Sequence, residues 1–318
     1  MRRILAAFCL LSSSAAFSAE APKSVLVVNS GEASLSVIDI ASQRETRKIP
    51  MLREPHHWVM TPDGKDLIIG DTVANELVLL DPDTFEIRRH ITVPDPYQML
   101  FTPDGSKLVV AGLARKQVDV YEAGTYKLLH RFAARTMPSH IDISADSSTA
   151  YISLQGTNKA MALDLIHNTV KWEVPTDGAP AGVLLRNGKL LVATMDTDTV
   201  QILDANSGAT IGHIKATKGA HQIFISPDKK QIFINSRIDA SITVVDSTDF
   251  QHIRTYKVPG GPDDLIFMPD GKVWATLRFV QKVGVIDLKT GSIETIAVGR
   301  SPHGIYVNGA TNMGGANR

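Results

Sequence analysis

Short apolar stretches that end in an acidic residue recur along the whole chain. Each consists of two or three mostly apolar residues followed by Asp or Glu, and successive acidic positions are 40 to 42 residues apart. The seven acidic positions are Asp39, Asp81, Glu122, Asp164, Asp204, Asp246 and Asp287. Seven copies in step indicate an internal repeat, and the repeat decides the architecture.

A second marker, a turn sequence, lies out of phase with the first. Thr61-Pro62-Asp63-Gly64 is the clearest copy, because Pro presets one turn dihedral while Asp and Gly tolerate the next ones. A run of strand-forming residues follows each turn, as in 67–70. Related turns begin at Thr102, Ser144, Arg186, Ser226 and Met268. Each repeat therefore predicts four short strands in about 41 residues, with no long segment of helical periodicity.

Four strands at this spacing predict one blade of a β-propeller, and seven repeats predict a closed ring. The predicted fold class is all-β, a seven-bladed β-propeller with four antiparallel strands per blade, over residues 23–308. A two-sheet sandwich is disfavoured because it would not repeat its turns so evenly.

The pair of apolar segments 25–29 and 35–39, together with the Pro-Asp-Gly turns, resembles the YVTN-type repeat family of bacterial secreted and periplasmic propellers, within the quinoprotein amine dehydrogenase-like superfamily. The resemblance covers 23–308. It implies that 25–29 is a second strand and 302–307 an inner strand. One blade would then take its inner strand from the C-terminal part of the chain and its other three strands from 24–50. The family includes binding, scaffold and enzyme members, so it implies little about function.

The first residues have the pattern of a secretory signal peptide. A basic start at Arg2 and Arg3 precedes a short apolar stretch and then small residues up to Ala19. We therefore expect 1–19 to be removed and the protein to be exported, to the periplasm if the cell is Gram-negative. The mature chain would contain no cysteine, which excludes disulfides and thiol chemistry. Residues 309–318, rich in Gly and Asn, are expected to be a flexible tail.

The charge balance excludes one class of partner. Without Arg2 and Arg3 the chain has 31 basic and 33 acidic residues. This balance gives no basic face for a nucleic-acid backbone. No later apolar stretch approaches membrane-spanning length, so the mature chain is not expected to cross a membrane. The predicted partners are a small ligand or another extracytoplasmic protein.

Aligning the repeats brings one set of residues to one mouth of the central channel. The inner strands begin after a recurring Pro, or after Gly219 in the one blade without it, and the next two residues lie at the rim. Five of the ten histidines fall at these positions. The pairs are His56-His57, Tyr97-Gln98, Ser139-His140, Ala181-Gly182, Ala220-His221, Asp263-Asp264 and His303-Gly304.

One interpretation of this mouth is a metal site. Imidazoles from different blades could converge on copper, zinc or iron. His57, His140 and His221 are expected to share one repeat position and so form the best trio, with His56 and His303 one residue earlier. The competing interpretation is structural, with each His hydrogen-bonded to loop backbone along a wet channel.

A second interpretation is a site for an anionic ligand. Arg115, Arg237 and Arg278 are expected near the same rim, and a guanidinium matches a carboxylate or phosphate. Tyr97, Gln98, Asp263 and Asp264 complete the predicted ligand-binding residues. Neighbouring residues on a strand point to opposite sides, so Asp263 and Asp264 are not expected to act on one substrate together. One of them could face His221 as a base or metal ligand, although such acids usually form turns, and the arginines could pair with neighbouring acids instead.

No complete catalytic motif is present, because the sequence lacks Gly-x-Ser-x-Gly, His-Glu-x-x-His, a phosphate loop and Cys-x-x-Cys-His. We therefore expect a non-enzymatic binding propeller that uses the His- and Arg-rich mouth. Two alternatives stay open. The first is a metal-binding protein or metal-dependent enzyme, such as a lactonase-like hydrolase or a redox accessory. The second, implied by related propellers, is a carrier of a tetrapyrrole or quinone cofactor.

Overall fold

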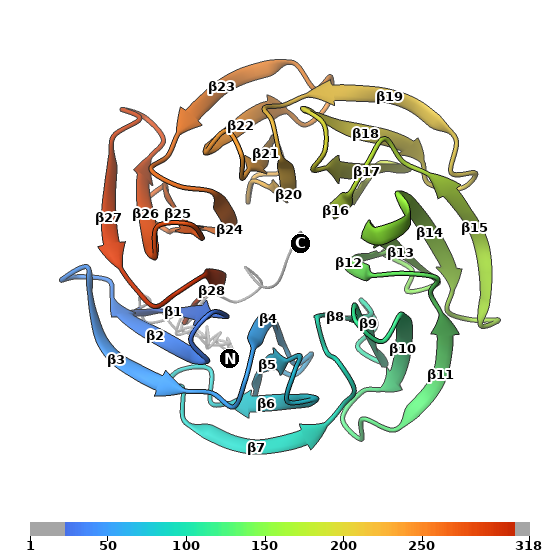
Figure 1. Cartoon of the computed structure of the whole chain (residues 1–318), viewed down its shortest axis with the longest axis horizontal. Helices are drawn as coiled ribbons and strands as arrows, with labels where there is room; N and C mark the ends of the chain where they lie inside the picture. Colours follow the sequence, from blue (N-terminus) through green and yellow to red (C-terminus); the bar gives the residue numbers. More distant parts are fainter. Residues whose placement is uncertain (1–22, 309–318) are drawn as a thin grey trace, which may run out of the picture.

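Seven four-stranded antiparallel sheets stand in a ring around a central channel in the computed structural model, which describes residues 23–308 (Figure 1). The predicted seven-bladed all-β propeller is thus confirmed. The segments predicted to be a signal peptide, 1–19, and a flexible tail, 309–318, lie outside the described residues. Within 23–308 no helix has the length and hydrophobicity that crossing a membrane requires.

Each blade runs from an inner strand at the channel to an outer strand at the rim of the disc. In chain order, the first complete blades are β4 (Pro55–Met60), β5 (Leu67–Asp71), β6 (Glu76–Leu80), β7 (Ile87–Thr92); β8 (Gln98–Phe101), β9 (Lys107–Gly112), β10 (Gln117–Glu122), β11 (Leu128–Ala133); and β12 (Pro138–Ile143), β13 (Thr149–Leu154), β14 (Lys159–Asp164), β15 (Thr169–Pro175). A 3₁₀ turn, η1 (Gln155–Thr157), joins β13 to β14.

The next three blades follow the same order. They are β16 (Pro180–Arg186), β17 (Lys189–Thr194), β18 (Thr199–Asp204), β19 (Thr210–Lys215); β20 (Ala220–Ile225), β21 (Gln231–Ser236), β22 (Ser241–Asp246), β23 (His252–Lys257); and β24 (Pro262–Phe267), β25 (Lys272–Leu277), β26 (Lys282–Asp287), β27 (Ile293–Ala297).

The remaining blade closes the ring with strands from both ends of the described chain. Its order is β28 (Pro302–Val307), β1 (Ser24–Asn29), β2 (Ser34–Asp39) and β3 (Arg44–Pro50), so the predicted shared blade is confirmed. Leu26 lies opposite Tyr306 in the β1–β28 ladder. In Figure 1 the red β28 lies beside the blue β1. Because this pairing is between distant parts of the chain, the ring can close only when both ends have folded.

Burial follows the position of each strand in its blade. Every residue of β5 and of β13 is buried, because both faces of each sheet pack against neighbouring blades. The outer strand β3 is mostly exposed. Trp58 shows how blades are joined, since its Nε1 donates to the carbonyl of Ile305 at 2.9 Å and its ring lies 5.0 Å from that of Tyr306.

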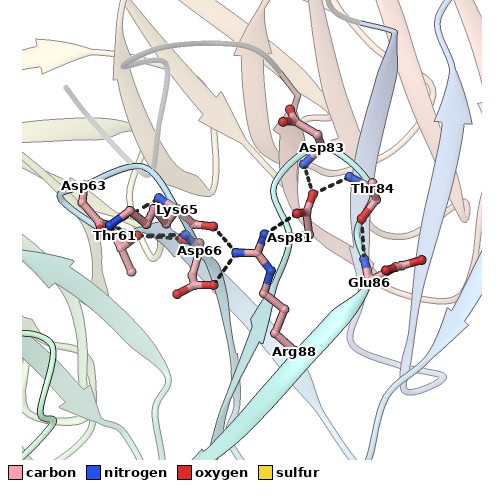
Figure 2. Close-up of polar contacts among 9 residues, drawn as sticks. All are labelled: Thr61, Asp63, Lys65, Asp66, Asp81, Asp83, Thr84, Glu86 and Arg88. Atoms are coloured by element: carbon pink, nitrogen blue, oxygen red, sulfur yellow. Dashed lines mark hydrogen bonds and ion pairs between the residues drawn. The ribbon is translucent and has the colours of Figure 1, made fainter.

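The recurring acidic residue at the end of the third strand organises a turn. In the blade of β4–β7, Oδ1 of Asp81 accepts hydrogen bonds from the backbone N–H groups of Asp83 and Thr84 at 2.9 and 2.8 Å (Figure 2). Arg88 pairs with both Asp81 and Asp66. The preceding Pro-Asp-Gly turn is held by the hydroxyl of Thr61, which donates to Asp63. These turns lie at the face of the disc opposite the histidine mouth.

Candidate functional site

A bulge at the start of the inner strands aims side chains at the channel axis. In six of the blades described over 23–308, the register of pairing between the inner strand and the second strand shifts near the start of the inner strand. The shift falls between its first residue and its third or fourth residue. A bulge bends the strand and re-aims the side chains beside it. This explains how His56 and His57, which are adjacent in β4, both join one cluster, with ring centroids 4.9 Å apart.

All five predicted histidines form one continuous buried cluster. The ring of His303 lies 3.9 Å from that of His56 and 4.4 Å from that of His57. His140 lies 5.5 Å from His57 and 5.3 Å from His221, again between ring centroids. None of the five side chains is more than 4% exposed. The phase assigned to the repeat thus brings together residues from four blades.

One detail of the sequence alignment was wrong. His221 was expected to share the position of His57 and His140, with Gly219 in place of the recurring Pro. Ala220 lies opposite Ser236 as Pro55 lies opposite Asp71, so Ala220 itself takes the Pro position. His221 therefore aligns with His56, His303 and Asp263, and the trio that lies closest together is His56, His57 and His303. The missing proline caused this slip of one residue.

Asp263 connects the histidines to two arginines. Its Oδ1 pairs with Nη2 of Arg237 and lies 3.2 Å from Nδ1 of His221, while its Oδ2 pairs with Nη1 of Arg278 at 3.0 Å. Nε2 of His303 lies 3.7 Å from the same Oδ2. Although burial alone would raise the pKa of Asp263, Arg237, His221 and Arg278 hold it below its usual range. Asp263 therefore stays charged, and its carboxylate is shared by two guanidiniums.

Burial keeps the histidines neutral. It lowers the pKa of His57 to about 3 and lowers the pKa values of His56, His140, His221 and His303 well below their ordinary value. A neutral imidazole has one ring nitrogen with a free lone pair, which can accept a hydrogen bond or bind a metal.

Several of these ring nitrogens have no hydrogen-bond partner within the described chain. They are Nδ1 of His56, Nε2 of His57, Nε2 of His140, Nδ1 of His221 and both ring nitrogens of His303. A buried polar atom without a partner costs roughly 1–3 kcal/mol. These unpartnered nitrogens are chemically able to bind water, a ligand or a metal ion.

Asp264, the next residue, faces a different environment, as the alternation of strand side chains predicts. Its Oδ1 accepts from the N–H of Leu265 at 2.9 Å, and its side chain lines a small cavity together with His57 and Gln98. Burial, reinforced by the charge of Asp263, raises the pKa of Asp264 to about 8. It is a neutral acid at pH 7 and does not belong to the Arg-paired cluster.

The other predicted ligand residues divide between the cluster and its surroundings. The Tyr97 ring covers His56 at 4.2 Å between centroids. Gln98 lies inside the channel, and its Oε1 accepts from the N–H of Ile141, so it joins two blades. Arg115 lies apart, because it is the third residue after β9, whereas Arg237 and Arg278 directly follow β21 and β25. The guanidinium of Arg115 is exposed and donates to Oδ1 of Asn75.

Exposed apolar residues surround half of this mouth, a feature that the sequence analysis missed. Val73, Ile238 and Phe279 each lie two residues after the end of a second strand and are 52%, 61% and 63% exposed. A Cβ added to Gly261, just before β24, would lie 2.5 Å from the Phe279 ring, and one on Gly219 would lie 2.7 Å from Ile238. These two apolar side chains thus lie directly against the beginnings of the inner strands. Aligning the ends of the second strands would have shown that Val73, Ile238 and Phe279 occupy the same position of the repeat.

Two exposed arginines lie between Phe279 and Val73 in the order of the blades around the mouth. Arg53 and Arg300 each lie two residues before an inner strand, on either side of the shared blade, and both are exposed. Leu52 beside Arg53 is 52% exposed. We call Leu52, Arg53, Val73, Ile238, Phe279 and Arg300 the mouth rim. These residues belong to four consecutive blades of the ring in Figure 1, from β20–β23 through the shared blade to β4–β7.

Solved structures share the fold at low sequence identity. A protein from Desulfotomaculum acetoxidans, described as functionally unknown, superposes with a TM-score of 0.77 at 12% identity and covers 90% of this chain and 98% of its own. The dihydro-heme d1 dehydrogenase NirN in complex with DHE gives 0.69 at 13% identity over 96% of this chain and 79% of its own. Hydrazine synthase from Kuenenia stuttgartiensis gives 0.68 at 15% identity over 92% and 99%. These likenesses show the fold alone.

Among curated proteins, none matches this sequence significantly. A family model, in contrast, matches almost the whole chain. It is described as the YNCE-like beta-propeller and matches residues 4–311. This match agrees with the seven blades and with the YVTN-type repeat resemblance of the sequence. The chain therefore belongs to the YNCE-like β-propeller family.

Proposed function

We propose that this protein is an exported binding protein that holds a small, partly apolar organic anion at the histidine mouth, without turning it over. The observation that carries the proposal is the mouth rim, in which exposed apolar side chains and the exposed Arg53 and Arg300 surround a buried cluster whose polar atoms lack partners within 23–308. Apolar surface combined with a few well-placed polar groups is typical of small-molecule sites.

The chemistry of the rim favours an anion. Among the contacts of the described residues, neither Arg53 nor Arg300 forms an ion pair through its side chain, and Arg237 and Arg278 share the single carboxylate of Asp263. A guanidinium presents a planar fork that fits a carboxylate. The exposed Phe279 ring offers a surface on which a flat apolar body can stack.

The burial of the unpartnered imidazole nitrogens favours a small ligand over a protein partner. The unpartnered imidazoles are at most 4% exposed, and they lie below the partly exposed Tyr97. A small molecule that enters the channel mouth can reach such atoms, whereas a flat protein surface contacts only the rim. The predicted extracytoplasmic protein partner therefore has weaker support than the predicted small ligand.

A tetrapyrrole is a specific candidate within this class. NirN, whose propeller superposes over 96% of this chain, was solved in complex with DHE. Tetrapyrroles combine a flat apolar ring with carboxylates, which are the two properties that the rim can recognise. No described contact favours the quinone alternative over a tetrapyrrole.

The test uses metal-free protoporphyrin IX, which is flat, apolar and carries two carboxylates. We expect saturable one-to-one binding to the untagged mature protein by absorbance and fluorescence titration. Phe279→Ala and the double variant Arg53→Ala/Arg300→Ala should each raise Kd about tenfold, which corresponds to about 1.4 kcal/mol. Ile166→Ala is the matched control, because Ile166 is 60% exposed on the opposite face.

Two results would count against the proposal. If Ile166→Ala weakens binding as much as Phe279→Ala, the porphyrin adsorbs to apolar surface in general. If the dimethyl ester of the porphyrin, which lacks the carboxylates, binds as tightly as the acid, the arginines do not recognise an anion. Circular dichroism of each variant checks that the propeller is intact.

A further inference from the structure

We propose that His56, His57 and His303 form a binding site for one late first-row transition-metal ion, with copper bound most tightly and zinc less so. One ring nitrogen from each of these three side chains lies within 4.8 Å of the others. Metal–nitrogen bonds of about 2.0–2.1 Å place ligand nitrogens about 3.3 Å apart in a tetrahedral site. Small rotations of the three rings are enough to close this difference.

The three rings are held in place from two strands. His56 and His57 are adjacent at the bulge of β4, and His303 is the second residue of β28. Gly304 allows this approach, because a Cβ there would lie 3.2 Å from the backbone oxygen of His56 and 3.0 Å from the Trp58 ring. The ladder that closes the propeller therefore also brings together the three nitrogens.

The nitrogens that a metal needs are vacant within the described chain. Nδ1 of His56, Nε2 of His57 and both nitrogens of His303 are buried without a hydrogen-bond partner. Each of the three side chains is at most 4% exposed, so bulk water does not satisfy them freely. A neutral imidazole nitrogen that is buried and unpartnered is the form that binds copper and zinc.

A carboxylate lies near the second ring nitrogen of His303, at a distance longer than a hydrogen bond. Nε2 of His303 lies 3.7 Å from Oδ2 of Asp263, which leaves Nδ1 of His303 for the metal. In metal sites the second ring nitrogen commonly donates to a carboxylate, which fixes the ring and strengthens the ligand. Arg237 and Arg278 already occupy this carboxylate, so the proposed metal ligands are imidazole nitrogens alone. Among divalent first-row ions, copper binds such ligands most tightly.

His140 and His221 are neighbours of the site and not part of it. Nδ1 of His140 lies 3.1 Å from the hydroxyl of Ser139, and Nδ1 of His221 lies beside Oδ1 of Asp263. His140 packs edge-on against His57 at 5.5 Å between centroids. This contact makes His140 a sharp control, since its removal alters the surroundings of the trio without removing a proposed ligand.

The experiment titrates the mature, untagged protein, first stripped with EDTA, with Cu²⁺ and Zn²⁺ alone, against a competing chromophoric chelator. We expect one equivalent of either ion, tighter binding of copper, and a rise in the thermal midpoint with each. The Cu²⁺ electron paramagnetic resonance spectrum should show coupling to imidazole nitrogens. His303→Ala and His57→Ala should each weaken binding at least a hundredfold, whereas His140→Ala and the surface variant His90→Ala should stay within about threefold of the wild type.

Three outcomes would overturn the proposal. Folded wild-type protein that binds no stoichiometric ion would show that the three histidines do not form a metal site. An equal loss in His140→Ala and His303→Ala would show that the trio is not the ligand set. Retained binding in His303→Ala, or in His303→Gln if the alanine variant is unfolded, would place the ion elsewhere. The organic ligand is absent from this titration, so the result is independent of porphyrin binding at the rim.

Discussion

Oδ1 of Asp263 and Nδ1 of His221 lie 3.2 Å apart inside the channel, although 42 residues separate them along the chain. The same carboxylate pairs with Arg237 and Arg278. One acidic side chain therefore neutralises part of the charge of two arginines and fixes the electrostatic balance of the mouth.

Replacing this carboxylate should be costly. We expect Asp263→Asn to lower the free energy of unfolding by about 3–5 kcal/mol, because it leaves two largely buried guanidiniums without their counter-ion. Urea denaturation at pH 7 measures the effect. Asp270→Asn is the control, since Asp270 is an exposed acid 3.8 Å from Lys272 and should change stability by less than about 0.5 kcal/mol. If Asp263→Asn lowers the free energy of unfolding as little as Asp270→Asn does, the carboxylate of Asp263 is not needed as the counter-ion of Arg237 and Arg278.

Acidification should destabilise the protein through its buried histidines. Their pKa values are lowered in the folded state, that of His57 to about 3, while an unfolded histidine titrates near 6.5. Between these values the unfolded chain binds protons that the folded chain does not, so stability falls as the pH falls. Each histidine contributes about 1.4 kcal/mol per pH unit in that window.

Denaturation midpoints at pH 7.5, 6.5 and 5.5 measure this slope. We expect His57→Gln to lower this slope by the contribution of one proton, about 1.4 kcal/mol per pH unit. A wild-type slope no steeper below pH 6.5 than above it would mean that the histidines are protonated in the folded protein.

Asp264 should produce the opposite trend at higher pH. Burial and the charge of Asp263 raise its pKa to about 8 from an ordinary 3.8, so the folded form keeps a proton that the unfolded form has lost. Its contribution is fully present below pH 3.8 and disappears as the pH rises through 8. Between pH 6.5 and 8 the titration of Asp264 should subtract about 2 kcal/mol from the stability that the histidines add over the same range.

Asp264→Asn should remove this loss and therefore gain stability relative to the wild type between pH 6.5 and 8, because an amide does not titrate and still accepts the hydrogen bond from Leu265. Guanidinium denaturation of both proteins at pH 6.5 and 8.0 tests the prediction. A stability difference between the two proteins that is the same at both pH values would show that Asp264 does not titrate in this range.

Gly182 allows two blades to approach at the channel. A Cβ there would lie 2.2 Å from Oε1 of Gln222 and 2.8 Å from the backbone oxygen of His221. Gly182→Ala should therefore destabilise the protein by about 1–3 kcal/mol. At Gly212 the nearest atom to an added Cβ is 3.6 Å away, so Gly212→Ala should be nearly neutral in the same thermal unfolding experiment. Equal midpoints for the two variants would rule out this steric explanation for glycine at 182.

The repeat made much of this structure predictable. Turn sequences such as that at Thr61, and acids such as Asp81, act within a few residues of themselves, so their spacing could be interpreted without coordinates. The five histidines were identified as one cluster because the repeat period fixes which residues meet at the axis. The alignment failed by one residue at His221, where the proline that marks the other blades is absent. Arg115 was expected near the same rim as Arg237, and it lies two residues further along its loop.

The sequence by itself determined the number of blades and the histidines at the mouth, because these depend on local strand and turn chemistry repeated at a fixed period. The shared closure was implied by its resemblance to the YVTN-type family. Only the tertiary structure decided which of those residues touch. It paired Asp263 with two arginines, brought His303 against His56, and left ring nitrogens vacant, because contacts across the channel depend on strand bulges and on packing between blades that no single repeat encodes.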